Sequence, residues 1–125
     1  MSKLLFTFAA CSGMLGVVLG AFGSHALRGR LDERLQHAFE TGVNYQVSHS
    51  LVLLFVCLAA AHWGKHWALT ASSVSFAAGI VLFSGSLYLL ALTGIKWIGP
   101  VTPLGGLALI LGWGLLAVGI WQNAT

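Results

Sequence analysis

The charged residues of this chain are confined to a few places, and their distribution constrains the fold more than any other feature. Among 125 residues, six are Lys or Arg and three are Asp or Glu. Six of the nine lie between positions 28 and 40, and four mostly apolar stretches of about 20 residues are free of charge. Each stretch can cross the roughly 30 Å hydrocarbon core of a bilayer. The sequence therefore predicts an all-α integral membrane protein, a four-helix transmembrane bundle.

The four predicted spans cover most of the chain and leave room for one domain only. They run from about 4 to 23, 43 to 63, 67 to 92 and 103 to 122, so residues 1–125 form a single transmembrane domain. Charged residues make up 7% of the chain, against about a quarter in soluble proteins. The net charge of +3 is dispersed and forms no basic tract, which argues against a nucleic acid partner.

The connection between the first two spans, residues 24–41, is polar but retains a helical pattern. Apolar side chains recur on one side at Leu27, Leu31, Leu35 and Phe39, and acidic or amide side chains occupy the other. This pattern predicts a short amphipathic helix lying in the membrane interface, with Gly42 capping it or allowing the turn into span 2. A plain solvated linker is the alternative.

Small residues recur at helical spacing in three of the four spans. Such stripes let a neighbouring backbone approach closely in membrane helices, and a ligand groove against bare backbone is the alternative. The stripes predict a tight, nearly solid bundle. The positions predicted to pack are Gly13, Gly16, Gly20 and Gly23 in span 1, Ser75 and Gly79 in span 3, and Gly105, Gly112 and Gly119 in span 4.

The orientation in the membrane is predicted from Lys and Arg alone. The first and third connections share one side of the membrane and carry four of these residues, and the opposite side carries Lys3 and Lys65. The positive-inside rule then predicts both termini outside the cytoplasm. Trp63 and Trp67 flank the turn between spans 2 and 3 and are typical of an interfacial aromatic belt.

A group of polar residues near the start of span 2 is the candidate site. We predict that His25 and His49 lie on the same side of the membrane, because they stand at the ends of spans 1 and 2 beside the polar connection. Buried polar groups near them would need partners in hydrocarbon. Three roles stay open: hydrogen bonds that anchor the interfacial helix, a metal or proton site, and contact with lipid headgroups. The cluster comprises His25, Glu40, Asn44, Tyr45, Gln46 and His49.

Other signatures of chemistry are weak or missing from the sequence. No predicted span contains Asp, Glu, Lys or Arg, which counts against an ion-coupled transporter. The chain has no CxxC pair and no phosphate-binding glycine loop after a strand. Cys11 and Cys57 lie in apolar runs and are expected to behave as small hydrophobic residues. We predict no catalytic residue, no cofactor and no bound metal.

Five motifs in order carry a resemblance to a known family. They are Gly20–Leu27 (GAFGSHAL), Thr41–His49 (TGVNYQVSH), Phe83–Gly94 (FSGSLYLLALTG), Gly99–Gly106 (GPVTPLGG) and Gly112–Trp113. With them the chain resembles the YgdD/YwdK-like family of small bacterial membrane proteins (domain of unknown function 423), over nearly its whole length. The resemblance implies four helices and a multi-pass location in the bacterial inner membrane. It implies no activity, so no catalytic residue can be transferred.

Three functional hypotheses remain at this point. The first is a non-enzymatic structural, accessory or lipid-interacting bundle, which packs with lipid, with itself or with a larger membrane complex through its glycine faces. The second is a small oligomeric transporter or channel with His25, Tyr45 and His49 lining its mouth. The third is a membrane metal-binding protein or enzyme that uses His25, His49 and Glu40.

Overall fold

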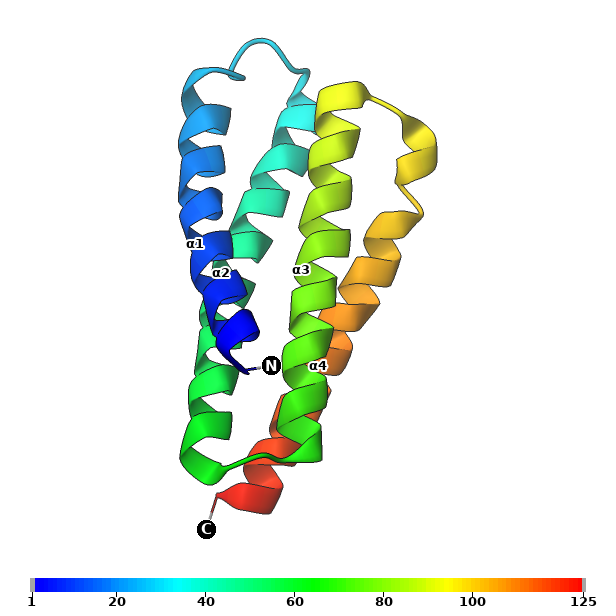
Figure 1. Cartoon of the computed structure of the whole chain (residues 1–125). Coiled ribbons are helices and arrows are strands. Elements are labelled where there is room, and N and C mark those ends of the chain that lie inside the picture. The colour runs from blue at the N-terminus through cyan, green and yellow to red at the C-terminus, as the bar shows by residue number, and fades with distance from the viewer. Residues whose placement is uncertain (1, 125) are drawn as a thin grey trace.

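The computed structural model describes residues 2–124 and consists of four long helices with one short 3₁₀ turn (Figure 1). Each long helix is long and apolar enough to cross a membrane. The described residues contain no strand, and the predicted all-α four-helix fold is confirmed. The elements are α1 (Ser2–His25), α2 (Glu33–Trp63), α3 (Trp67–Thr93), η1 (Lys96–Ile98) and α4 (Val101–Asn123).

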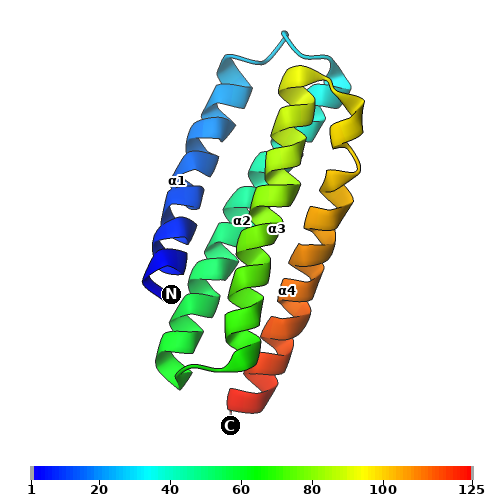
Figure 2. The ribbon, with the colours of Figure 1, turned by 45° about the vertical axis from the view of Figure 1, so that its right-hand side comes forward.

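The helices run up and down, and each packs mainly on the next one along the chain. The two ribbon views show α1 beside α2 and α4 beside α3, while α2 and α3 form the middle of the molecule (Figures 1 and 2). The largest hydrophobic core lies among the helices around Leu53, Phe76 and Leu109, all nearly inaccessible. The start of α1 and the end of α4 therefore lie at the same end of the bundle (Figure 2).

The predicted interfacial helix over residues 24–41 is not a separate element. The chain turns at Gly29, whose φ of +83° favours glycine, and α2 begins at Glu33. Asp32 caps α2, because its side chain accepts a hydrogen bond of 2.8 Å from the Leu35 N–H. From Glu33 the helix continues without a break to Trp63.

Burial explains why this amphipathic segment joins α2 instead of lying in the interface. Phe39 is 1% exposed and packs under α1, where a Cβ added to Gly23 would lie 2.7 Å from the Phe39 ring. Gly42, expected to cap or turn, lies inside α2 and is covered by the ring of Tyr88. The apolar side of the segment thus faces other helices, with the hydroxyl of Ser84 donating to the Gly42 carbonyl.

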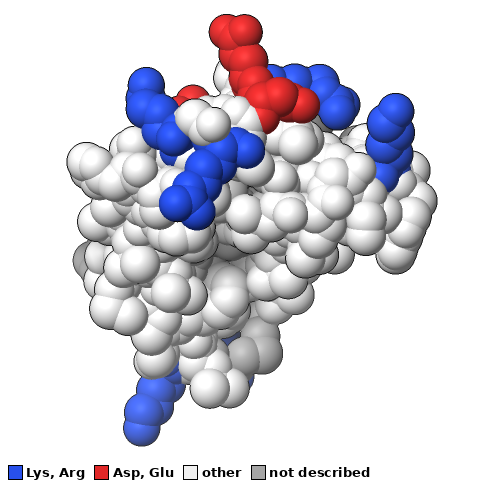
Figure 3. All heavy atoms as spheres, turned by 90° about the horizontal axis from the view of Figure 1, so that it is seen from above, with Lys and Arg blue, Asp and Glu red and all other residues white. Residues whose placement is uncertain are grey.

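Charged side chains divide between the two ends of the bundle. Viewed from the end that carries the α1–α2 and α3–α4 connections, both acidic and basic side chains gather there (Figure 3). All three acidic residues of the chain lie between positions 32 and 40. Lys3 and Lys65 lie at the opposite end, near the start of α1 and in the α2–α3 turn. The orientation of the bundle across the membrane stays a prediction from these positions.

Candidate functional site

The glycine stripe of α1 faces α2 along its whole length. A Cβ added to Gly16 would lie 2.5 Å from Val47 Cγ2, and one added to Gly20 would lie 3.3 Å from Val43 Cγ1. Gly13 and Gly23 face Ser50 and Phe39 in the same way. The contacts of this seam are made by side chains of α2 against the bare backbone of α1. This close approach brings polar side chains of α2 within reach of α1 carbonyls.

Gln46 is the centre of a buried network that joins three helices. Its Nε2 donates to the Ser12 carbonyl oxygen of α1 at 2.8 Å, and its Oε1 accepts from the Tyr88 hydroxyl of α3 at 2.5 Å. Ser50 Oγ lies 2.8 Å from Ser12 Oγ and 2.6 Å from the Gln46 carbonyl oxygen. Gln46 is 6% exposed and Ser50 1% exposed. The network therefore satisfies these polar groups with one another in the membrane interior.

A second seam joins α3 to α4 and brings backbone against backbone. A Cβ added to Gly105 would overlap the backbone nitrogen of Phe83, and one added to Gly79 would lie 3.0 Å from the Leu109 nitrogen. Two serines of α3 donate across the seam to carbonyl oxygens of α4, Ser75 to Ala108 at 2.6 Å and Ser72 to Gly112 at 2.7 Å. Gly112 and Gly119 complete the α4 face, opposite Phe76 and Leu69.

His49 connects α2 to α4 through Trp113. The indole N–H of Trp113 donates to His49 Nε2 at 3.1 Å, so Nε2 must be the unprotonated ring nitrogen. The proton is then on Nδ1, which donates to the Tyr45 carbonyl oxygen at 2.9 Å. The imidazole also stacks on the Tyr45 ring with centroids 5.5 Å apart and contacts Phe76 at a tilt. Both nitrogens of this neutral ring are therefore engaged within the bundle.

The six residues of the predicted cluster do not form one site. Gln46 faces α1 and α3, whereas His49 faces α4. His25 is exposed at the end of α1, and Glu40 accepts a bond of 3.3 Å from Gln36 Nε2 on its own helix. Asn44 and Tyr45 are exposed on α2.

The depth of His49 separates it from His25. Because α2 extends from Glu33 to Trp63, His49 lies near its centre, about 24 Å along the helix axis from Glu33. His25 is the last residue of α1, next to the α1–α2 connection. The structure thus places the two histidines at different depths, and not together at one end as predicted.

Three residues that complete these networks were not selected from the sequence. Ser12 is one of two hydroxyl side chains in an apolar span, and Tyr88 and Trp113 resemble ordinary aromatic residues in the sequence. Each carries a polar group at membrane depth, which requires a partner in hydrocarbon. That requirement predicts from the sequence that each of these residues has a hydrogen-bond partner. It does not identify the partner, which depends on how the helices pack.

The arrangement offers limited chemistry. The described residues hold no group of three His, Cys, Asp or Glu side chains close enough to share a metal ion. Gln36 Oε1 is the one buried side-chain polar atom without a partner in the described part of the chain. It lies on the first turns of α2, near the connection to α1, where Gln36 Nε2 donates to the Gly23 carbonyl at 3.0 Å. Most of the other buried side-chain contacts described above, those of Gln46, Ser72, Ser75, Ser84 and Trp113, join one helix to another.

Comparison with known proteins gives a consistent family assignment. A family model described as a protein of unknown function (DUF423) matches residues 19–106. The chain is 40% identical to the UPF0382 membrane protein YwdK of Bacillus subtilis, over 93% of this chain and 94% of that protein. It is 42% identical to the UPF0382 inner membrane protein YgdD of Escherichia coli K12, over 94% of this chain and 89% of that protein.

No solved structure matches this chain. The family model covers more than half of the chain, and the alignments with YwdK and YgdD cover nearly all of it. None of these descriptions names an activity, in agreement with the resemblance found in the sequence motifs. With its four membrane-crossing helices, the chain belongs to the DUF423 family of bacterial membrane proteins and is a multi-pass protein of the inner membrane.

Proposed function

We propose that this protein is a non-enzymatic accessory component of the inner membrane that acts through its outer surface on lipid or neighbouring proteins. The observation that carries the proposal is the closed polar network around Gln46, Ser12 and Tyr88. A catalytic or transport site needs polar groups free to meet a substrate, whereas these groups are engaged by neighbouring helices. The same holds for both ring nitrogens of His49.

The glycine faces support this proposal in a revised form. They were expected to contact lipid, a second copy or a larger complex, but in this chain they are covered by neighbouring helices. The α1 glycines face α2, the α4 glycines face α3, and Gly79 of α3 faces α4. A homo-oligomer or complex would therefore use the outward surfaces of α1 and α4. In the most apolar segments of these two helices, only 17% and 28% of the residues are buried. Membrane lipid is the other partner of these surfaces.

The proposal is tested by asking whether the bundle conducts. Purified protein is reconstituted into liposomes that contain the pH-sensitive dye pyranine, with valinomycin and potassium to clamp the membrane potential. We expect proton flux equal to that of protein-free liposomes after a pH step. Flux that increases with protein content and is abolished by His49→Ala would overturn the proposal.

A small oligomeric transporter is the second candidate, and Tyr45 favours it. Tyr45 is 43% exposed and stacks on His49, so it joins the outer surface of α2 to a buried imidazole. In an oligomer this pair would line a shared interface, as a proton pathway requires. The pyranine assay separates the two candidates, because only the transporter predicts flux that responds to Tyr45→Phe and His49→Ala.

A further inference from the structure

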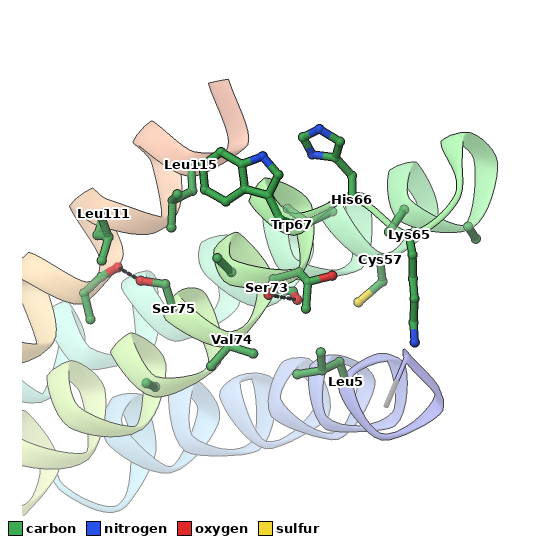
Figure 4. A pocket seen from close by; sticks show the side chains of 17 residues that line it. Leu5, Cys57, Lys65, His66, Trp67, Ser73, Val74, Ser75, Leu111 and Leu115 are labelled. Atoms are coloured by element: carbon green, nitrogen blue, oxygen red, sulfur yellow. Dashed lines mark hydrogen bonds between the residues drawn. The ribbon is translucent and has the colours of Figure 1, made fainter. Parts of the chain in front are cut away.

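A mostly apolar groove lies over α3 at the outer surface of the bundle, away from Gln46 and His49, with the bonded pair Ser75 and Ala108 in its lining. It has a volume of about 1040 Å³, at the upper end of small-molecule sites. Its floor is α3, where the outward side chains are small, and its walls are Leu5 of α1 and Leu111 and Leu115 of α4 (Figure 4). Cys57 of α2 also lines it. The small side chains of α3 therefore leave a recess between two ridges.

The groove continues along α3 for about the depth of one leaflet. A second depression of about 480 Å³ shares Val74 and Ala78 with the first and extends to Leu82. From Thr70 to Leu82 the helix rises about 18 Å, close to the roughly 15 Å of one hydrocarbon leaflet. A transmembrane helix of a second copy would need a groove about twice as long. The length thus favours a single lipid chain as the occupant.

The end of the groove at the α2–α3 turn is suited to an anionic headgroup. Lys65, His66 and Trp67 line that end, and the Lys65 side chain extends toward the start of α1 (Figure 4). Tryptophan at this level is typical of the membrane interface. All acidic residues of the chain lie between positions 32 and 40, at the opposite end, so no carboxylate side chain competes for Lys65. The positive charge of Lys65 complements the phosphate of one phospholipid, and the apolar groove beside it complements an acyl chain.

We infer that this groove is a binding site for one anionic phospholipid, with an acyl chain along α3 and the phosphate at Lys65. The inference goes beyond the proposed function and does not depend on it. A groove on the outer surface binds lipid whether or not the interior conducts, so failure of the pyranine test leaves this site standing. Failure of the lipid test below likewise leaves the sealed interior standing.

The site is tested by native mass spectrometry of the full chain, released from detergent after addition of phosphatidylglycerol or phosphatidylcholine with the same acyl chains. We expect one phosphatidylglycerol per chain and weaker retention of phosphatidylcholine. Lys65→Gln is expected to weaken phosphatidylglycerol binding about fivefold, the effect of one basic residue near an anionic surface. Its matched control is Lys96→Gln, which removes an exposed charge at the opposite end.

A second pair of variants tests the apolar part. Ala78→Phe fills the point where the two depressions meet, and Ala78 is exposed, so the change leaves the core intact. Ala117→Phe is the control, on an exposed position of α4 that does not line the groove. Equal lipid retention by the two Phe variants, or equal binding of both lipids by the wild type, would overturn the site. A dimer that Ala78→Phe dissociates would identify a second copy as the occupant and also overturn it.

Discussion

The two glycine seams of this bundle use the same small residue for different kinds of contact. At the α3–α4 seam the missing Cβ of Gly105 lets α4 touch the backbone of Phe83, and two serines of α3 donate to α4 carbonyls. At the α1–α2 seam the glycines meet only side chains, such as that of Val47, and the polar links come from the longer amide of Gln46. A backbone cannot move aside, whereas a side chain can change rotamer or be shortened. The α3–α4 seam should therefore be intolerant of change and the α1–α2 seam adjustable.

The largest expected effect is at the rigid seam. Gly105→Ala places a methyl group against the backbone of Phe83, so α4 must move away along the seam. We expect a loss of about 3 kcal/mol in the free energy of unfolding, the upper part of the range for overpacking. The measurement is reversible unfolding in mixed micelles of mild detergent and SDS, followed by circular dichroism.

The control for this change lies on the same helix. At Gly114 an added Cβ would meet no atom of another helix within 4 Å in the described chain. Gly114→Ala should therefore leave stability unchanged or raise it by up to about 1 kcal/mol, through the better helix propensity of alanine. Equal destabilisation by the two alanine variants would contradict the backbone-contact account of the seam.

The next effect is at the adjustable seam and should be reversible by a second change. Gly16→Ala introduces a methyl group 2.5 Å from Val47 Cγ2, and we expect a loss of about 1–2 kcal/mol. Combining it with Val47→Ala removes the atom that is struck, so the double variant should be more stable than Gly16→Ala alone. A double variant whose losses simply add, by the same unfolding assay, would show that this seam is as rigid as the other.

The polar network should give a smaller effect that depends on both partners. Gln46→Leu leaves the Tyr88 hydroxyl without its acceptor inside the bundle, at an expected cost of about 1–2 kcal/mol. Tyr88→Phe in the same chain removes the stranded hydroxyl, so the double variant should recover part of that loss. A double-mutant cycle of the unfolding free energies measures the coupling, and zero coupling would argue against the bond.

The smallest expected effect is loss of one serine hydroxyl at the rigid seam. Ser75→Ala removes a donor to the Ala108 carbonyl, at a cost of about 0.6 kcal/mol, the average for hydrogen bonds between membrane helices. The glycine contacts, and not this bond, fix the distance between α3 and α4. The loss of unfolding free energy should therefore be far smaller than that caused by Gly105→Ala. A loss of unfolding free energy comparable to that of Gly105→Ala would show that the hydrogen bonds, and not the glycine contacts, make this seam rigid.

The sequence was sufficient for the four helices, because twenty apolar residues without charge have few alternatives in a membrane protein. It was not sufficient for the connection at residues 24–41. An amphipathic pattern is the same whether the apolar side faces lipid headgroups or other helices, and only the burial of Phe39 between α1 and Tyr88 separates the two. The prediction of an interfacial helix was wrong for that reason.

The candidate site was harder to predict than the fold. Glycine stripes identify the helix faces at which a neighbour can approach closely, but a residue without a side chain cannot specify that neighbour. The grouping of His25 with His49 depended on where α2 begins, and its start at Glu33 places His49 near the helix centre. The partners of Gln46 and His49 on α1, α3 and α4 are separated from them by 34 to 64 positions, so no local pattern contains them.

The central claim is that the polar groups inside this bundle are engaged with one another and not held ready for a substrate. The most direct test is the ¹⁵N NMR spectrum of the His49 imidazole in lipid nanodiscs at pH 7, assigned by comparison with His49→Gln. The account predicts a neutral ring protonated at Nδ1, with an Nε2 resonance that shifts in Trp113→Phe because its hydrogen bond is lost. A ring protonated at Nε2, whether neutral or cationic, or an Nε2 resonance unchanged in Trp113→Phe, would contradict it.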